Sequence, residues 1–537
     1  MVKVKTSIVA CFHNSSIIAS YSSDIFNLAG AGETELAATM TVFPRRKGEL
    51  VLLPTNKIYT IIMTVGSVLV TGCVTVGPDY VSPEISAPQK WTVKSSGSAA
   101  VEPRDSRALT RWWATLNDPQ LSGLIDRAVS NNLDLKKAIS SVREARARRG
   151  GSAADQYPSV TASASASEQR SSTATVAPGI GAIQRTYSAG LDATWELDLF
   201  GGKRRSVEAA QADLEASEED LNSVLVTLTG EVALNYVDVR SYQARLAIAE
   251  ANRDAQAETC QIAQWRFEAG LVTQLDVEQA KLNLEQTRAQ IPALQVGLEA
   301  AKNRLAVLLG KHPGNLENEL SEKKSIPTAS LMIAVGVPAD VLRNRPDVRK
   351  AERQLAAQSA RIGVATADLY PKFSLTGSIG LEALSPGKLF TAGNENYGLS
   401  FPISWTLFDA GRVRQNINAQ NALQEQALAH YEATILSALE EVENALIAYA
   451  QEQNRLQFLS LAEQAAQKSF DLAKSRYTSG LTDFQVVLDS QRSLLSVQDS
   501  RVVSEAQVTT DLIRLYKALG GGWTPLSSAA EPLKNRS

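Results

Sequence analysis

The stretch Tyr187-Ser-Ala-Gly-Leu-Asp-Ala-Thr-Trp-Glu-Leu-Asp-Leu-Phe-Gly201 alternates apolar and polar residues and then continues into a long segment without proline. A second stretch, Tyr397-Gly-Leu-Ser-Phe-Pro-Ile-Ser-Trp-Thr-Leu-Phe-Asp-Ala-Gly411, has the same pattern. Trp195 matches Trp405 and Gly201 matches Gly411, both at an offset of 210 residues. Period-two alternation is typical of a strand, and the residues after each glycine have helical spacing. We therefore predict a strand that passes directly into a very long helix, twice in one chain.

The rest of the chain repeats around these two stretches. Tyr157-Pro158 returns as Tyr370-Pro371 at an offset of 213, while Gly270 returns as Gly480 and Gly310 as Gly520 at an offset of 210. The three-residue difference falls between the paired strands, where a loop accepts insertions most easily. A duplication of this size predicts two halves of one architecture. We predict a first repeat at residues 118–310, a linker at 311–337, a second repeat at 338–522 and a polar C-terminal tail at 523–537.

Four segments are predicted to be strands, at residues 159–167, 187–199, 373–381 and 397–407. Alternation over about ten residues with aromatic residues near the ends is the pattern of an outer-membrane β-barrel. A half-buried sheet of a soluble protein would alternate as well. Four strands cannot close a barrel, because about eight is the smallest number found. If the sheet lies in a membrane, copies must therefore join, and two would supply eight strands and three would supply twelve.

The helical segments are far longer than a globular domain requires. No proline occurs between Gly202 and about Phe267, and about 65 residues of helix extend about 100 Å. A break at Gly270 precedes a returning helix that Gly310 ends as a C-cap, and Pro292 should kink that helix or shift its register. Before the strands, helical spacing predicts one helix from Asp118 to just before Tyr157.

The amino-terminal region is predicted to be a targeting segment. Basic residues precede an apolar run at 58–70, which is too short for a comfortable membrane span and ends in Leu69-Val-Thr-Gly-Cys73. This ending resembles a bacterial lipobox with Cys73 as the acylated residue, although a cysteine could also follow such a run by chance. Residue 74 is Val rather than Asp, which by resemblance directs a lipoprotein to the outer membrane. We predict a signal sequence at 1–72, in which 1–39 lie upstream of a true start at Met40, and a lipid-anchored extended tether at 73–117.

Several stretches together carry a family resemblance from about Leu69 to Trp523. They are Cys73-Val-Thr-Val-Gly-Pro-Asp-Tyr80, Trp195-Glu-Leu-Asp-Leu-Phe-Gly201, Asn344-Arg-Pro-Asp-Val-Arg349, Leu488-Asp-Ser-Gln-Arg-Ser-Leu-Leu495 and Leu515-Tyr-Lys-Ala-Leu-Gly-Gly-Gly-Trp523. With them the chain resembles the TolC/OprM-like outer-membrane factors, most closely the lipidated drug-efflux branch. The resemblance implies an α+β membrane protein, a homotrimer whose twelve-stranded outer-membrane β-barrel continues into a twelve-helix periplasmic α-barrel.

The same resemblance implies a function and partners. The expected protein is the outer-membrane channel of a tripartite efflux system, a passive duct that carries drugs and small toxic molecules from the periplasm to the outside. It would lie in outer-membrane lipid, extend into the periplasm and dock to a periplasmic adaptor (membrane fusion protein) and an inner-membrane pump. The alternative is a lipid-tethered periplasmic coiled-coil scaffold or adaptor, which would have no use for the four alternating strands.

Family positions for a periplasmic gate carry over only in part. The resemblance places Asp489 on the pore, and Asp276 and Tyr477 in a network that closes the tunnel beside the helix turns at Gly270 and Gly480. Three aspartates near one axis would repel one another or bind a cation, although Asp489 could also be an ordinary exposed carboxylate on a helix. Where some members have an arginine and a second aspartate, this chain has Thr482 and Val486, so a weaker polar lock is expected.

The matched Trp and Gly residues are interpreted as a barrel–tunnel junction. Trp195 and Trp405 would lie at the periplasmic membrane interface, where tryptophan is enriched. Gly201 and Gly411 would let the chain turn from each strand into the tunnel wall.

Catalytic, cofactor and metal sites are not predicted, so the chain is not expected to be an enzyme. His312 and His430 are isolated, and Cys11, Cys73 and Cys260 show no metal-ligand spacing. Gly201-Gly202-Lys203 lacks the remaining residues of a P-loop. A net charge of −3 without a basic cluster argues against a nucleic-acid partner.

Overall fold

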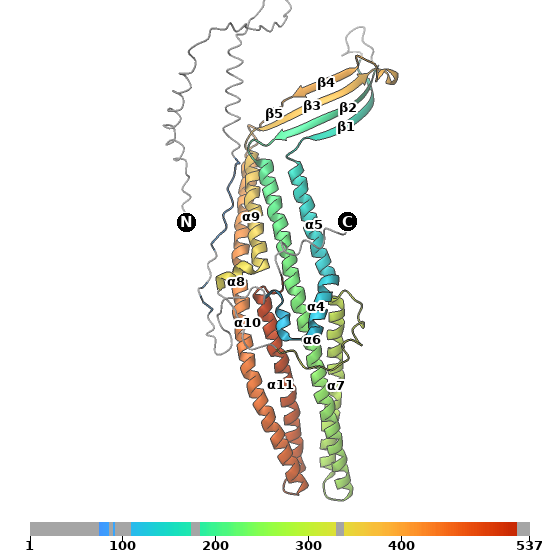
Figure 1. Cartoon of the computed structure of the whole chain (residues 1–537), viewed down its shortest axis with the longest axis vertical. Helices are drawn as coiled ribbons and strands as arrows, with labels where there is room; N and C mark the ends of the chain where they lie inside the picture. Colours follow the sequence, from blue (N-terminus) through green and yellow to red (C-terminus); the bar gives the residue numbers. More distant parts are fainter. Residues whose placement is uncertain are drawn as a thin grey trace, which may run out of the picture. The chain divides into compact units, whose positions relative to one another are not determined.

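The computed structural model describes residues 75–84, 88, 90–91, 109–172, 183–328 and 338–523. The chain divides into two units, Met1–Cys73 and Val74–Ser537, and every described residue belongs to the second. The predicted signal sequence, the lipobox with Cys73 and residues 524–537 lie outside the described residues. In the second unit, an antiparallel sheet continues into long helices that run side by side (Figure 1).

The sheet brings the two predicted hairpins together in the order β1-β2-β3-β4, with each neighbouring pair antiparallel. Its register places Leu191 opposite Ile379 and Trp195 opposite Leu375, so the apolar faces of the two hairpins coincide. The opposite face pairs Asp192 with Ser378 and is rich in Ser, Thr and Gly. The strands are β1 (Ser159–Arg170), β2 (Ile183–Leu197), β3 (Lys372–Ala383), β4 (Glu395–Ser400) and β5 (Ile403–Ser404).

The fourth predicted strand is wrong in one respect, because it is interrupted. Residues 395–404 keep a single register against β3, but β4 ends at Ser400 and β5 begins at Ile403. Pro402 lies in the gap and has no N–H to donate to the ladder, although its carbonyl still accepts from the Ser374 N–H at 3.0 Å. The alternation was read correctly, but the proline divides the strand.

The long helices confirm both the predicted duplication and the predicted lengths. α6 (Gly202–Glu268) and α10 (Arg412–Thr478) each contain 67 residues, about 100 Å of helix. α7 (Gln274–Leu308) and α11 (Phe484–Ala518) each contain 35 residues and run back along them. α7 continues through Pro292. The α6–α7 and α10–α11 hairpins also contact each other through α11 and α6.

The predicted single helix between Asp118 and Tyr157 is wrong, since two helices occupy this segment. The break lies at Asn132, whose ψ of 137° is extended and whose side chain accepts a hydrogen bond from Leu135 N at the start of the second helix. Helical spacing of apolar residues continues across Asn132, so the spacing alone did not reveal the break. The shorter helices are η2 (Trp112–Leu116), α4 (Pro119–Asn131), α5 (Leu133–Ala154), α8 (Pro338–Asn344), α9 (Pro346–Ala367) and η3 (Pro386–Lys388).

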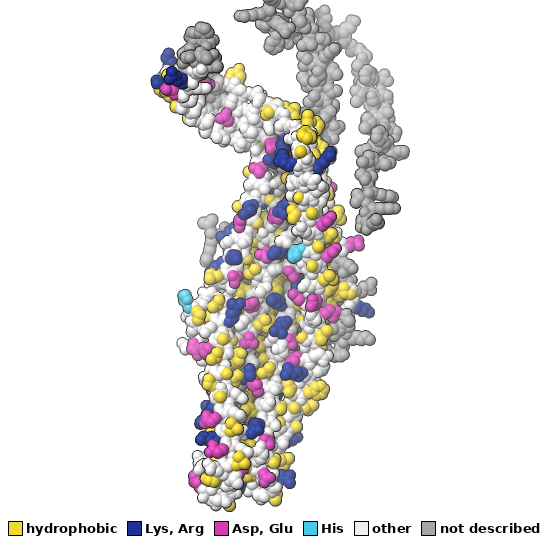
Figure 2. Space-filling model, turned by 180° about the vertical axis from the view of Figure 1, so that it is seen from behind, with side chains coloured by type: hydrophobic (Ala, Val, Ile, Leu, Met, Phe, Trp, Pro, Cys, Tyr) yellow, Lys and Arg dark blue, Asp and Glu magenta, His cyan; other side chains and the backbone are white. Residues whose placement is uncertain are grey.

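The main core lies where the short helices of the first repeat meet the long ones. Trp112, Tyr236, Leu305 and Ile513 from η2, α6, α7 and α11 are buried in one cluster. On the face shown in Figure 2, charged side chains of both signs are interspersed along the helices, whereas the middle of the sheet carries few. Within the described residues, none of the helices combines the length and apolarity that crossing a bilayer requires.

Candidate functional site

Both helical hairpins turn at a glycine with the same conformation. Gly270 and Gly480 have φ of 71° and 72°, a left-handed region that other residues adopt only with strain. The following residues, Leu271 and Leu481, donate backbone hydrogen bonds to Arg266 O and Arg476 O at 2.8 and 2.9 Å. These bonds close the helix ends with the Schellman pattern. The two turns lie at the ends of the hairpins remote from the sheet (Figure 1).

Tyr477 lies in an apolar cluster near these turns. Its ring contacts that of Phe484, with centroids 5.1 Å apart, and the Arg266 guanidinium lies 4.4 Å from its ring centroid. The cluster joins all four long helices, including Val277 of α7 and Leu488 of α11. The Tyr477 hydroxyl is buried and has no hydrogen-bond partner among the described residues. Tyr477 therefore holds the two hairpin ends together mainly by packing.

Asp276 belongs to the start of α7. Its carboxylate accepts hydrogen bonds from the backbone N–H and the hydroxyl of Thr273 at 2.9 and 2.8 Å, which completes a capping box. Asp276 lies on the first hairpin and Tyr477 on the second. The hydrogen bonds of the Asp276 carboxylate thus stabilise its own helix start.

Asp489 is an exposed side chain on α11, five residues after the start of that helix. It accepts a hydrogen bond from Gln485 Nε2 at 3.0 Å and forms an ion pair with Arg492 at 3.4 Å. Arg492 Nε in turn donates to Asn283 Oδ1 of α7 at 2.9 Å. The sequence predicts Asp489 as a pore residue but does not single out Arg492 or Asn283. The spacing of three residues between Asp489 and Arg492 was a local signal for their contact.

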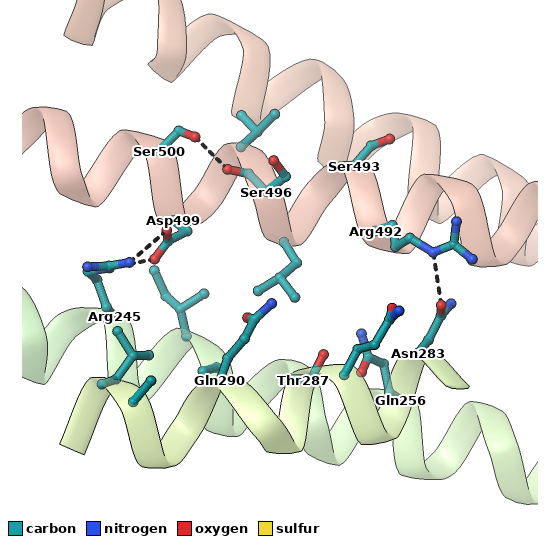
Figure 3. A pocket seen from close by; sticks show the side chains of 17 residues that line it. Arg245, Gln256, Asn283, Thr287, Gln290, Arg492, Ser493, Ser496, Asp499 and Ser500 are labelled. Atoms are coloured by element: carbon teal, nitrogen blue, oxygen red, sulfur yellow. Dashed lines mark hydrogen bonds and ion pairs between the residues drawn. The ribbon is translucent and has the colours of Figure 1, made fainter. Parts of the chain in front are cut away.

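A polar groove of about 850 Å³ lies between α6, α7 and α11 next to this contact. Figure 3 shows Arg492 and Asn283 at one end and the ion pair of Arg245 with Asp499 at the other. Arg245 donates to both carboxylate oxygens of Asp499, at 2.7 and 3.1 Å. Gln256 and Asn283 are buried in the wall, and each has one amide atom without a partner among the described residues. The joint between the two hairpins is therefore polar and incompletely hydrogen-bonded.

The strand-to-helix junctions have the same geometry in both repeats. Gly201 and Gly411 are the N-caps of α6 and α10, with φ of 82° and 86°. The indole N–H of Trp195 donates to Gln156 O at 2.8 Å, and that of Trp405 donates to Leu369 O at 3.0 Å. Gln156 and Leu369 are themselves equivalent, at the repeat offset of 213. Each Trp therefore ties the end of its strand to the end of the preceding short helix.

The apolar face of the sheet is exposed over most of its area. Leu399, Ile379 and Val160 on three different strands have 79%, 64% and 65% of their surface accessible. Exposed apolar patches of this extent indicate contact with a membrane or another protein. A sheet with such a face that passes twice into helices of about 100 Å defines the chain as an outer-membrane channel subunit.

The chain belongs to the outer membrane efflux protein family, whose profile matches residues 124–311 and 337–521. Nodulation protein T from Rhizobium leguminosarum bv. trifolii is 32% identical over 480 residues, covering 86% of this chain and 97% of that protein. The solvent efflux pump outer membrane protein SrpC from Pseudomonas putida is 32% identical over 460 residues, covering 85% and 97%. Among solved structures, the outer-membrane channel OprN has a TM-score of 0.78 and 37% identity, covering 84% of this chain and 100% of that one. The family consists of transport conduits in the outer membrane.

Proposed function

We propose that three copies of this chain form a passive duct, the exit of a tripartite efflux system, that carries drugs and small toxic molecules from the periplasm to the outside. The observation that carries the proposal is the exposed apolar face of a sheet whose strands lead directly into the long helices. In the assembled duct, four strands per copy would give twelve strands, and the long helices would continue them as a tunnel. An inner-membrane pump and a periplasmic adaptor would supply the energy and the connection.

The internal duplication supports a ring of copies. Within one chain, β2 of the first repeat pairs with β3 of the second, and α6 packs on α9. If the two repeats exchange roles, the equivalent contacts are β4 with β1 and α10 with α5. These contacts would form between neighbouring copies. In the described residues, β1 and β4 each pair along one side. An open edge is not tolerated in lipid, so joining copies would satisfy both strands.

The relatives support a duct that selects little by itself. Their names include a solvent efflux pump protein, a pyoverdine export protein and an antibiotic efflux pump protein, all 31–32% identical to this chain. Relatives that share one fold thus export very different compounds. This agrees with a system in which the pump, and not the outer-membrane duct, selects the substrate.

The periplasmic end would hold the gate. Asp489 would face the pore from α11, Tyr477 would hold the hairpin ends together, and Asp276 would stabilise the turn after Gly270. Arg492 lies beside Asp489, so a ring of three such pairs would carry less net negative charge than three isolated aspartates. At the other end, Trp195 and Trp405 would mark the periplasmic membrane interface. Acylation of Cys73 after removal of residues 1–72 would anchor the segment that precedes the described residues.

The test is the conductance of the purified full-length protein in planar bilayers, with and without divalent cations on the periplasmic side. The Asp489→Ala variant should conduct and lose cation block. Asp471→Ala is the matched control, because Asp471 accepts the same bond from a glutamine four residues earlier, at 3.0 Å, but lies on α10. Block that persists in Asp489→Ala would refute the pore assignment. A protein that never conducts, even in gate variants, would be the tethered scaffold instead.

A further inference from the structure

An extended segment at the start of the described residues lies against the first junction. We name Thr75–Glu84 the amino-terminal strap. Its Val76 N–H donates to Phe200 O at 3.0 Å, immediately before the turn at Gly201. A Cβ on Gly201 would lie 2.6 Å from Thr75 Cγ2, so the strap packs directly on the turn.

Arg205 of α6 receives the strap. This side chain is only 4% exposed, and its Nε donates to Val76 O at 3.2 Å while its Nη2 donates to Asp79 Oδ1 at 2.6 Å and Gly77 O at 3.4 Å. Its remaining ion pair is with Glu208 on its own helix, at 2.7 Å. A buried guanidinium that loses its acceptors is costly. The strap therefore supplies most of the hydrogen-bond acceptors that compensate for burying the charge of Arg205.

The strap approaches α9 at backbone distance. Gly77 has a φ of 89°, and a Cβ built on it would lie 2.4 Å from Gly363 Cα. A Cβ on Gly363 would in turn lie 2.8 Å from Arg205 Cγ. Glycine at both positions is what lets the strap, α9 and the Arg205 side chain meet.

Side chains on α9 hold the second half of the strap. Tyr80 Oη and Ser82 Oγ both donate to Glu352 Oε1, at 3.2 and 2.8 Å, and the Arg353 guanidinium lies 5.7 Å from the Tyr80 ring centroid. Burial, with the Glu352 charge, raises the pKa of Tyr80 to about 12, so its hydroxyl remains a donor well into the alkaline range. The strap is thus bound along its length by two helices from different repeats.

The second junction has the same turn, but the described residues provide no such cover there. Nothing among the described residues lies within 4 Å of a Cβ built on Gly411. The position equivalent to Arg205 is Gln415, and the position equivalent to Gly363 is Gly150, which also has nothing within 4 Å. The strap is therefore not a feature that the duplication requires.

We propose that the surface of α6 and α9 around Arg205 is a binding site for the chain's own strap, and that Arg205 is the positioning residue. Docking through Arg205 holds the strap at the first junction and orders the turn at Gly201, while the second junction is independent of it. This role rests on contacts within one chain and does not depend on the duct being open, closed or conducting.

The test is hydrogen–deuterium exchange of the full-length protein in detergent, followed by mass spectrometry. In Arg205→Met, peptides covering the strap and residues 197–205 should exchange at least about tenfold faster, because a hydrogen bond to a charged group is lost. Peptides covering Gly411 should not change. Arg205→Lys should restore part of the protection. Arg361→Met is the matched control, since Arg361 links the same two helices through Asp213 but forms no hydrogen bond or ion pair with the described strap residues.

A second variant keeps Arg205 and alters the strap. Gly77→Val places a side chain against the backbone of Gly363, so it should produce the same local pattern. Val81→Ala, at a strap residue that is 81% exposed, should behave as wild type. Unchanged strap exchange in both Arg205→Met and Gly77→Val would overturn the proposal. Equal acceleration over the whole chain in both variants would also overturn it, since Arg205 would then be an ordinary core residue.

Discussion

The duplication is visible at single residues even where the residue type has changed. Asn132 precedes α5 and donates to Leu308 O, near the end of α7, at 2.9 Å. Its equivalent in the second repeat is Arg345, which precedes α9 and donates to Ala518 O at the end of α11 at 2.8 Å. An amide and a guanidinium thus perform the same task, because each is a donor that reaches an unpaired carbonyl at a helix end. Arg345 is longer and also pairs with Asp347 and Glu441.

Gly201 and Gly411 should respond unequally to substitution. Both have positive φ, so replacement with Val should cost at least about 1 kcal/mol at either position. Only at Gly201 would the new side chain also collide with Thr75. We expect both variants to lower the yield of membrane-inserted oligomer more than the conductance of each oligomer, with the larger loss for Gly201→Val. Heat-resistant oligomer on gels and single-channel recording measure the two quantities.

Gly123→Val provides the control for this comparison, because Gly123 lies on the exposed side of α4 with nothing within 4 Å of a Cβ. Equal yields for Gly201→Val and Gly411→Val would show that contact with the strap adds nothing to the cost.

At the scale of elements, the linker after α7 is held by ion pairs and by one buried arginine. Arg127 Nη1 donates to Glu319 Oε2 at 3.0 Å, and Lys302 Nζ donates to Glu317 at 2.9 Å. Arg240, which is fully buried, donates to Glu322 O at 2.7 Å. The described part of the linker is therefore bound to α4, α6 and α7.

These ion pairs predict acid sensitivity of the linker. Hydrogen bonds from Arg127 and Lys302 lower the pKa of Glu319 and of Glu317 below their usual values. A carboxyl whose pKa is lower in the folded state stabilises the fold above its unfolded pKa of about 4.3, and this contribution is lost as the pH falls through the folded pKa. Cleavage of residues 311–328 by pepsin should therefore increase as the pH falls below about 4.

In the Glu319→Gln variant, pepsin should cleave the linker readily already at higher pH. The rate of cleavage should then change less on acidification than in the wild type. Glu322→Gln is the control, because its carboxylate is exposed and pairs only with nearby Lys324 among the described residues. If cleavage of the Glu319→Gln variant has the same pH profile as that of the wild type, the Arg127–Glu319 ion pair does not hold the linker.

At the scale of the whole molecule, the repeat predicts the register between copies. Ala193 pairs with Gly377 within the chain. The equivalent of Ala193 in the second repeat is Ile403, 210 residues later, and the equivalent of Gly377 in the first repeat is Ala164, 213 residues earlier. The repeat therefore predicts that Ile403 of one copy lies opposite Ala164 of the next. The same rule places Trp405, Phe401 and Leu407 opposite Ala162, Ala166 and Val160, whereas Leu399 and Tyr397 fall opposite Glu168 and Arg170. The apolar face would thus remain continuous across the boundary between copies from Phe401 to Leu407.

Cysteines at Ala164 and Ile403, with Cys260 replaced by Ser, should cross-link neighbouring copies on oxidation and give covalent oligomers on reducing-agent-free gels. Cysteines at Ala164 and Ser404 are the control, because a shift of one residue moves the side chain to the other face of the sheet. Efficient cross-linking of the control pair in place of the first pair would show a different register or a different interface.

Local patterns decided which segments are strands and helices. Alternation identified the four strand segments, the absence of proline after Gly201 and Gly411 identified α6 and α10, and the glycines at 270 and 480 identified the turns. These features depend on residues near one another in the chain, so their sequence spacing reports them directly. The break at Asn132 and the division at Pro402 were missed because the apolar spacing continues across both.

The sequence by itself therefore determined the long helices, the strand segments and their repetition. Only the tertiary structure decided what lies against each element: Arg205 bound to the strap, Arg492 bound to Asn283, and the alignment of the apolar faces of the two hairpins. The first two contacts join residues more than 120 positions apart, and β2 and β3 are separated by most of the first repeat. Such contacts depend on how whole helices and strands pack, and no local spacing encodes that packing.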